Sequence, residues 1–250
     1  MSGHSKWATI RHKKAAADSK RGRVFTKIIK EITIAARLGG GDPDTNPRLR
    51  MAVQNAKVAN MPSDNIKRAI MKGTGEMPGQ VIEEVVYEGY GPGGVALYIE
   101  VMTDNKNRTV AEIRHILGKH NGNLGASNSV AWKFERKGRI IINRNNMDEE
   151  KLMEIALEAG AEDLEIDGQK CEIYTATADL ETVKDALSEH NIEIESAEIT
   201  LVPNSTVKVE EKHAEQLLKL MSKLEDHDDI QNVFSDFDIP DEILEKFSEE

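Results

Sequence analysis

Apolar positions repeat with a helical period in the first third of the chain. From Val24 onward they fall on one face at about 100° per residue, and lysines and arginines lie on nearly the opposite face. Asn46 and Pro47 suit an N-cap and a first turn, which predicts a second helix, and a third follows with Gly73 beyond its end. These one-sided apolar stripes predict a three-helix bundle, preceded by a loose arm over residues 1–23.

Beyond residue 80 the spacing of apolar residues changes to the alternation of β-strands. The elements expected before residue 138 are strands over 81–87, 95–102 and 129–134, and a helix over 107–120. The next elements are a strand over 139–143, a helix over 148–159, strands over 164–166 and 172–177, a helix over 181–189 and a strand over 193–202. This βαββαβ order is that of a ferredoxin-like unit. A helix over 210–224 and a strand over 230–234 follow it.

The elements on either side of the ferredoxin-like unit are too few to close a core separately, but together they are enough. We therefore predict an α+β multidomain fold, in which a three-helix bundle precedes two ferredoxin-like α+β domains, one inserted in the other. The predicted boundaries are 1–79 for a basic helical domain with its arm, 80–137 plus 204–240 for a discontinuous α+β domain, 138–203 for the inserted domain and 241–250 for an acidic tail.

The composition restricts the class of protein further. The chain has 250 residues, 39% of them apolar and 31% charged, and a single cysteine, Cys171. One cysteine excludes an internal disulfide framework or a structural site of several thiolates, and it fits a reducing compartment. No apolar run approaches the roughly 18–20 residues that cross a bilayer, and no continuous apolar signal core opens the chain. We therefore expect a cytoplasmic protein with no membrane partner.

Charge is distributed unevenly along the chain. The formal net charge is −11, yet residues 1–75 contain 16 Lys and Arg against 5 Asp and Glu, a net +11. The remaining residues therefore have a net charge of −22. Basic residues can simply solvate a helical surface, but too few acids are present here for regular i,i+4 pairing. The asymmetry favours a basic module that meets a nucleic acid, on a body that repels phosphate.

The candidate nucleic-acid contacts lie in the arm and along the cationic face of the first helix. They are Lys6, Trp7, Arg11, His12, Lys13, Lys14, Lys20, Arg21, Arg23, Lys27 and Lys30. The basic residues suit phosphates. Trp7 has two interpretations that do not exclude each other: an anchor that docks onto the helical bundle, or a ring that stacks on an exposed base or wedges into a groove.

No constellation of residues supports catalysis, a metal or a cofactor. The glycines of 89–94 match a dinucleotide-binding pattern, but a strand follows them instead of a helix, so a hairpin turn is favoured. Glu112 and His115, and likewise Glu210 and His213, have E-x-x-H spacing, but their helices are too short for a di-metal bundle. Cys171 lies within a strand pattern and is predicted to be a buried structural thiol.

Five segments of the chain point to a known family. They are SGHSKWATIRHKK at 2–14, GGGDPDTNPRLRMAVQNAKVANMPSDNIKRAI at 39–70, YEGYGPGGVALYIEVMTDNKNRT at 87–109, NSVAWKF at 128–134 and VFSDFDIP at 233–240. These segments resemble the YebC/PmpR family of small bacterial regulatory proteins. The resemblance implies three domains, the first helical and the others α+β, and a regulator of transcription that binds DNA. It also implies a ribosome-associated role in bacteria. The mitochondrial relatives of the family are similar to translational activators of a cytochrome oxidase subunit. The resemblance provides no agreed set of contact residues.

Two nucleic-acid functions remain open from the sequence. The first is a DNA-binding transcriptional regulator, although no convincing recognition helix is visible. The alternative is a translation factor whose arm orders on structured ribosomal RNA, which suits the low aromatic content of 4%. The predicted partners are thus DNA, ribosomal RNA or both, and a protein partner or a homo-oligomer is left open. An enzymatic function has no supporting residues.

Overall fold

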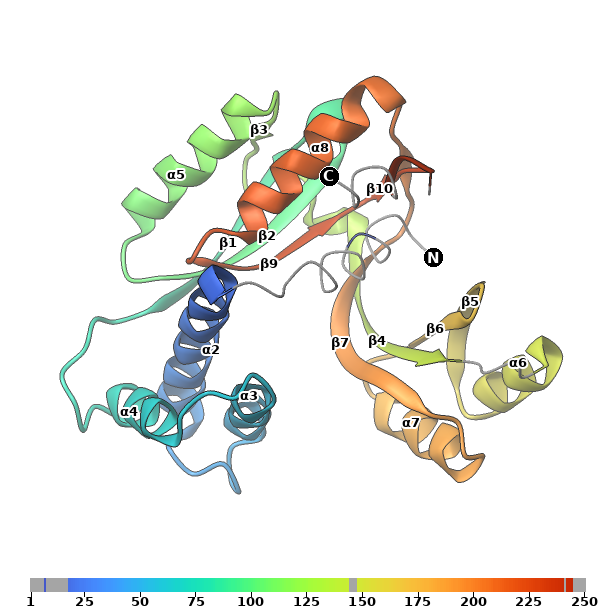
Figure 1. Cartoon of the computed structure of the whole chain (residues 1–250), viewed down its shortest axis with the longest axis horizontal. Helices are drawn as coiled ribbons and strands as arrows, with labels where there is room; N and C mark the ends of the chain where they lie inside the picture. The colour runs from blue at the N-terminus through green and yellow to red at the C-terminus, as the bar shows by residue number, and fades with distance from the viewer. Residues whose placement is uncertain (1–6, 8–17, 144–147, 241, 245–250) are drawn as a thin grey trace.

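In the computed structural model, the first three described helices form a bundle at one end of the molecule (Figure 1). The structure describes residues 7, 18–143, 148–240 and 242–244. The bundle helices are α2 (Asp18–Gly39), α3 (Pro47–Val58) and α4 (Ser63–Thr74). Helix α2 packs against both others around a core of aliphatic side chains that includes Ile32 and Leu49. Asn46 caps α3 as predicted, since its Oδ1 accepts from the amide of Leu49 at 3.1 Å.

Two boundaries in this helical domain differ from the sequence prediction. Helix α2 begins at Asp18, within the stretch expected to be a loose arm. Helix α4 continues past Gly73 and ends before Gly75, which adopts the left-handed conformation with φ of 83°. A Cβ on Gly73 would lie 2.4 Å from the carbonyl oxygen of Thr33, so this glycine allows α4 to cross α2 closely.

The first sheet has the strand order β3-β1-β2-β9, with β9 contributed from far along the chain. Its strands are β1 (Glu83–Tyr90), β2 (Ala96–Thr103), β3 (Asn123–Leu124) and β9 (Ile230–Ser235). Its helices are α5 (Lys106–Lys119) and α8 (Glu211–Glu225), which cover one face (Figure 1). β1 and β2 form an antiparallel hairpin through a short 3-10 turn, Pro92–Gly94, so the glycine-rich stretch is a turn, as expected.

The second sheet has the order β5-β6-β4-β7, which is that of a ferredoxin-like βαββαβ unit. Its elements are β4 (Phe134–Asn143), α6 (Glu149–Glu158), β5 (Ala161–Asp167), β6 (Lys170–Thr175), α7 (Leu180–Glu189) and β7 (Ile194–Pro203). Both helices pack on one face, and Cys171 is fully buried in this core, as predicted for a structural thiol. Because β9 follows this unit in sequence, one α+β domain is inserted in the other, and the predicted fold class is confirmed.

The segment between the two sheets differs most from the prediction. Residues 129–134 were expected to be a strand, but Ala131–Lys133 is a 3-10 turn and β4 runs unbroken from Phe134. The reason is the buried carboxylate of Glu88, which accepts the amides of Asn128, Val130 and Ala131 at 2.7–2.8 Å. Amides bound to this carboxylate cannot join a strand ladder.

A further pair of short strands closes the first sheet domain. β8 (Val207–Lys208) and β10 (Phe237–Asp238) pair in parallel, and the sequence pattern indicated neither. Among the described residues, no helix is both long and apolar enough to cross a lipid bilayer.

Candidate nucleic-acid interface

The structure describes only some of the predicted contact residues. Those outside the described residues are Lys6, Arg11, His12, Lys13 and Lys14, and the side chain of Lys20 is also outside them. Arg21 lies on the first turns of α2, exposed, with its guanidinium 5.8 Å from the centre of the Phe25 ring. The remaining predicted residues, Trp7, Arg23, Lys27 and Lys30, all contact the first sheet domain.

Trp7 lies in the core of the first sheet domain. Its side chain is only 4% exposed and belongs to the apolar cluster that includes Leu217 and Leu224 of α8. Its Nε1 donates to Oε1 of Glu225 at 3.2 Å. The anchor interpretation had placed this ring on the helical bundle, whereas the structure places it in a different domain. Base stacking by Trp7 would require the indole to leave this core.

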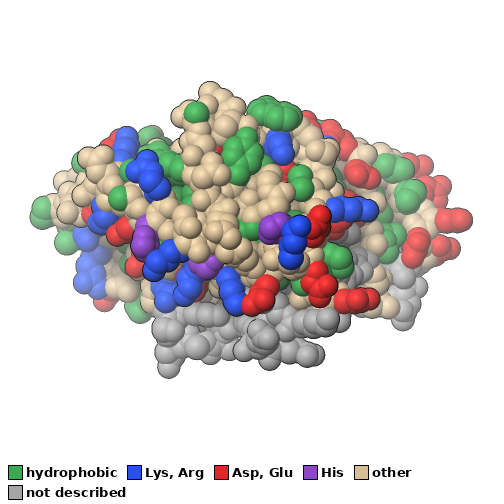
Figure 2. Space-filling view, turned by 90° about the horizontal axis from the view of Figure 1, so that it is seen from above, with side chains coloured by type: hydrophobic (Ala, Val, Ile, Leu, Met, Phe, Trp, Pro, Cys, Tyr) green, Lys and Arg blue, Asp and Glu red, His purple; other side chains and the backbone are tan. Residues whose placement is uncertain are grey.

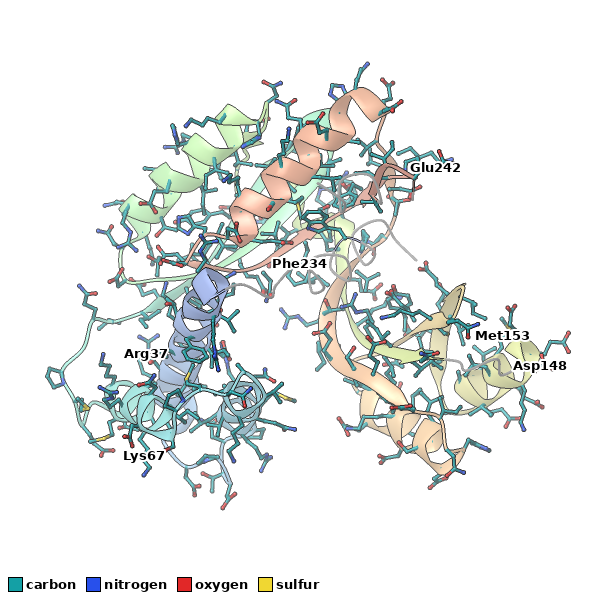
Figure 3. The ribbon with its side chains drawn as sticks, in the orientation of Figure 1. Arg37, Lys67, Asp148, Met153, Phe234 and Glu242 are labelled. Atoms are coloured by element: carbon teal, nitrogen blue, oxygen red, sulfur yellow. The ribbon has the colours of Figure 1, made fainter. Side chains whose placement is uncertain are left out.

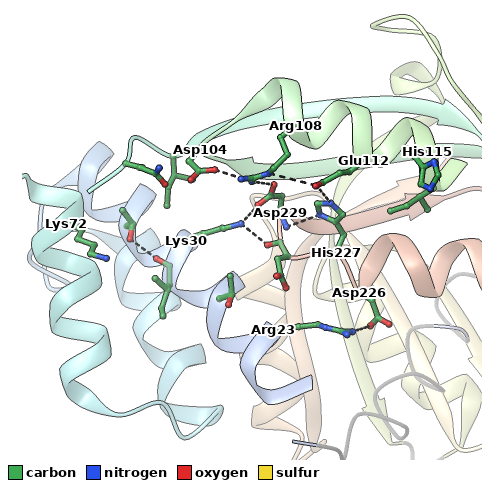
Figure 4. A pocket seen from close by; sticks show the side chains of 17 residues that line it. Arg23, Lys30, Lys72, Asp104, Arg108, Glu112, His115, Asp226, His227 and Asp229 are labelled. Carbon is green, nitrogen blue, oxygen red and sulfur yellow. Dashed lines mark hydrogen bonds and ion pairs between the residues drawn. The ribbon is translucent and has the colours of Figure 1, made fainter. Parts of the chain in front are cut away.

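The cationic face of α2 lies against an acidic loop, residues 225–229, which starts at the last residue of α8 and leads to β9. Arg23 Nη1 is 3.0 Å from Oδ1 of Asp226, and Lys27 Nζ donates to the carbonyl oxygen of Glu225 at 2.8 Å. Lys30 Nζ contacts Oδ1 of Asp229 at 2.5 Å (Figure 4). These three residues are spaced along one side of the helix, and one short loop binds all of them.

Asp229 is the centre of this interdomain contact. Its carboxylate also accepts from Thr103 at 3.2 Å, from Thr109 at 2.6 Å and from Arg108 Nη2 at 2.6 Å. Burial alone would raise the pKa of Asp229, but the hydrogen bonds from Lys30, Thr109 and Arg108 outweigh it, so the pKa lies well below its ordinary value. The carboxylate therefore stays charged and joins the helical domain to α5.

The same cluster has the geometry of a candidate metal site. Ligand atoms of Glu112, His227 and Asp229 all lie within 4.8 Å of one another. His227 Nδ1 accepts the amide of Asp229 at 3.1 Å, so its Nε2 carries the proton and donates to Glu112 at 2.9 Å. Lys30 and Arg108 already bind the Asp229 carboxylate. A divalent cation would have to displace both, so the arrangement acts as an ion-pair network.

A further ion pair fixes the helical domain to the first sheet. Arg48 of α3 contacts Glu31 of α2 at 2.7 Å and Glu84 of β1 at 2.6 Å. Hydrogen bonds to these two carboxylates raise the pKa of Arg48 above its ordinary value. The guanidinium therefore bridges the two domains.

Six other cations of the helical domain have no carboxylate partner within the described residues. These outer cations are Arg37, Arg50, Lys57, Lys67, Arg68 and Lys72. Each is exposed, and the hydrogen bonds of Arg50 and Arg68 to other described residues go to backbone carbonyl oxygens or to Asn65. Figure 3 shows Lys67 at the end of the bundle that lies away from the first sheet. Sequence analysis missed them as candidates because charge counting does not show which cations are neutralised within the fold.

A cleft of about 830 Å³ separates the helical domain from α5 (Figure 4). Lys72 lines its helical-domain side, His115 lines the α5 side, and the Asp229 network forms part of its wall. The cleft has charges of both signs.

Comparison with known proteins agrees with this architecture. Residues 5–76 match the family model of the TACO1/YebC protein N-terminal domain, and residues 82–237 match that of the TACO1/YebC second and third domain. The chain belongs to the TACO1/YebC family. The N-terminal match contains all eleven predicted contact residues.

Members of this family are similar to the chain over its whole length. A protein of Syntrophus aciditrophicus is 59% identical over 249 residues, covering 99% of this chain and all of that protein, and is named "Probable transcriptional regulatory protein". One from Dictyoglomus turgidum with the same name is 57% identical over 249 residues, with coverage of 99% and 100%. The crystal structure of a conserved hypothetical protein from Aquifex aeolicus matches with a TM-score of 0.77 and 50% identity, over 89% of this chain and 92% of that one.

Trp132 is an exposed aromatic residue that the sequence analysis did not select. Its side chain is 70% exposed, and its Nε1 donates to the carbonyl oxygen of Ser129 at 3.1 Å. The amides bound by Glu88 hold the preceding turn, and Lys133 beside it is fixed to the buried Asp236 at 2.7 Å. In the described structure the accessible indole ring is therefore that of Trp132 and not that of Trp7. Sequence analysis could not distinguish the two, because burial depends on tertiary contacts that residue type does not reveal.

Proposed function

We propose that this chain is a nucleic-acid-binding regulatory protein and that its target is DNA in the control of transcription. The observation that carries the proposal is the set of outer cations, which are exposed and have no carboxylate partner in the described structure. Phosphate oxygens are the natural partners of such residues. The names of the relatives support the regulatory role.

The fold separates the two parts that this function needs. The helical domain presents cations to a polyanion, whereas the acidic loop and the rest of the chain supply most of the negative charge. Like charges then keep phosphate away from the acidic parts of the molecule and orient the bound protein. The predicted arm residues Lys6, Arg11, His12, Lys13 and Lys14 are further phosphate contacts in the proposal, and Arg21 lies near the start of α2.

Binding through phosphate contacts makes the binding constant fall with salt concentration by a predictable amount. Six phosphates neutralised on duplex DNA give a slope of about −5 in log K against log salt. The full chain is titrated against a fluorescent duplex and a structured ribosomal RNA at several salt concentrations. A flat salt response would contradict the nucleic-acid function altogether.

A matched pair of variants tests which surface binds. One variant carries Lys67→Gln, Arg68→Gln and Lys72→Gln, and we expect its salt slope to be less steep by about 2.7. The control carries Lys151→Gln, Lys170→Gln and Lys184→Gln in the inserted domain, with the same change in net charge. Equal weakening in both variants would show that net charge, and not the outer cations, determines affinity.

The arm needs a variant of its own, because Lys13 and Lys14 lie outside the described residues. Replacing both with Gln, together with Arg21→Gln, should weaken binding without changing thermal stability. Unchanged affinity would restrict the interface to the bundle. Cross-linking in cells followed by sequencing then separates the targets: promoter DNA supports transcription control, and ribosomal RNA would replace it with translation.

A further inference from the structure

The outer surface of α5 and α8 has a second group of cations. Its members are Arg114, His115 and Lys119 of α5, His120 at the end of α5, and Lys219 and Lys223 of α8. We call this group the α5–α8 cluster. Figure 2 shows lysine, arginine and histidine side chains gathered over one half of the face seen from above, with acidic side chains more abundant toward the other end. This concentration is unexpected in the part of the chain whose net charge is −22.

Four members of the α5–α8 cluster, His120 and the lysines at 119, 219 and 223, are close enough to influence one another. Asn121, which follows α5, donates to Gln216 of α8 at 3.1 Å and so joins the two helices at this point. His120 lies partly buried between the lysines, and burial and the positive charges of Lys223, Lys119 and Lys219 all lower its pKa. The local potential is therefore positive.

The nearby carboxylates neutralise only one lysine of the cluster in the described structure. Glu215 pairs with Lys219, and Glu112 is bound to His227. In the described structure Arg114, Lys119 and Lys223 are exposed and pair with no acid. A lysine near a helix C-terminus can serve the helix dipole, which accounts for Lys119 of α5 and Lys223 of α8 taken singly. It does not account for Arg114, which lies in the middle of α5, or for the approach of Lys119, Lys219 and Lys223 to His120.

The cluster lies next to the cleft that borders the helical domain. His115 lines the α5 side of the cleft, and Lys72, one of the outer cations, lines the opposite side (Figure 4). We propose that the α5–α8 cluster is a second phosphate-binding surface, which contacts the backbone of the same nucleic acid that the outer cations bind. This inference rests on the proposed function and extends it to the first sheet domain.

A phosphodiester backbone fits this surface better than a protein does. Protein interfaces are built around a desolvated core of aromatic and aliphatic side chains. The large hydrophobic residues that are exposed in the described structure include Met51, Val58 and Trp132, and none of them lies on α5 or α8. Exposed cations without apolar neighbours are typical of phosphate contacts, which position a nucleic acid without reading its sequence.

The experiment uses the full chain carrying Arg114→Gln, Lys119→Gln and Lys223→Gln, with the same duplex DNA and salt series. Three lost phosphate contacts should make the slope of log K against log salt about 2.7 less steep, and affinity at low salt should fall. The inserted-domain control variant has the same net charge and should retain the wild-type slope. Thermal melting of each variant reports whether it is folded.

The possible results separate this inference from the proposed function. If the α5–α8 variant binds like the wild type while the Lys67, Arg68 and Lys72 variant loses affinity, the second surface is wrong and the first stands. If the wild type shows no salt-dependent binding to DNA or RNA, the proposed function fails and this inference fails with it. Loss in both variants, with retention in the control, supports one extended surface.

Discussion

The helical domain has two faces of opposite character, although both are basic in sequence. On the inner face, Arg23, Lys27 and Lys30 of α2 contact the acidic loop, and Arg48 bridges two glutamates. The six outer cations, one of which (Lys72) lines the cleft toward α5, have no carboxylate partner within the described residues. The inner cations attach one domain to another, whereas the outer ones remain available to an external polyanion.

This difference shows what a count of charges omits. The sixteen basic residues of the first 75 are equivalent in the sequence, but the acidic loop lies more than 190 residues away from the side chains that it binds. The inner contacts should therefore affect stability, and the outer cations should affect binding. Replacing residues on each face tests this distinction.

The largest expected change in stability comes from Trp7→Ala. It removes a buried indole from the core of the first sheet domain, which should lower the free energy of unfolding by about 4 kcal/mol. Trp132→Ala removes an exposed indole and should change it by less than about 0.5 kcal/mol. Urea unfolding measures both. Equal effects would mean that Trp7 is not held in this core in solution.

Asp229→Ala should have the next largest effect. It leaves the partly buried ammonium of Lys30 without its carboxylate, which should lower the free energy of unfolding by about 3 kcal/mol. The side chain of Arg108 is about half exposed, so water can solvate its guanidinium once Asp229 is removed, and the loss of this contact adds little to the change in the free energy of unfolding. The control is Asp228→Ala, whose carboxylate is exposed and should be nearly neutral. Calorimetry that gave the two variants the same midpoint would argue against the interdomain contact.

The same carboxylate makes stability depend on pH in a defined direction. The pKa of Asp229 in the folded chain lies below its ordinary value of 3.8. Its contribution is therefore complete above that value and is lost as the pH falls toward the lower pKa of the folded state. The melting temperatures of the wild type and of Asp229→Asn should converge as the pH drops below 4. A constant difference across this range would contradict the assignment.

Arg48→Gln should have a smaller effect. Its partners Glu31 and Glu84 are partly exposed, and solvent screens such pairs, so we expect a loss of about 1 kcal/mol that shrinks with added salt. Arg50→Gln on the same helix removes a cation without a carboxylate partner and serves as the control. A loss that salt does not reduce would indicate packing as its cause.

The smallest effect on stability is expected on the outer face. The variant with Lys67→Gln, Arg68→Gln and Lys72→Gln should stay within about 0.5 kcal/mol of the wild type, because these side chains are solvated. Its loss of nucleic-acid affinity would then be a direct effect of the missing cations. A large drop in melting temperature would instead place these residues among the structural contacts.

Much of the fold follows from local sequence. The Asn46 cap, the amphipathic stripe of α2 and the βαββαβ order of 139–203 each depend on spacing and residue type over a few residues. The positions at which the sequence predicted the wrong secondary structure depend on contacts with residues far away in the chain. Gly73 looks like a helix end until α2 is seen to lie against it, and residues 129–134 look like a strand until Glu88 binds their amides.

The sequence by itself determined the helices, most of the strands and the basic character of the first 75 residues, because periodicity and net charge are properties of neighbouring residues. Only the tertiary structure decided which cations are neutralised, where Trp7 packs, and that α5 and α8 bring their lysines together. Each of these depends on contacts between residues far apart in the chain, such as Lys30 with Asp229 and His120 with Lys223. Coulomb interactions and burial act through space, so they are fixed only once the chain has folded.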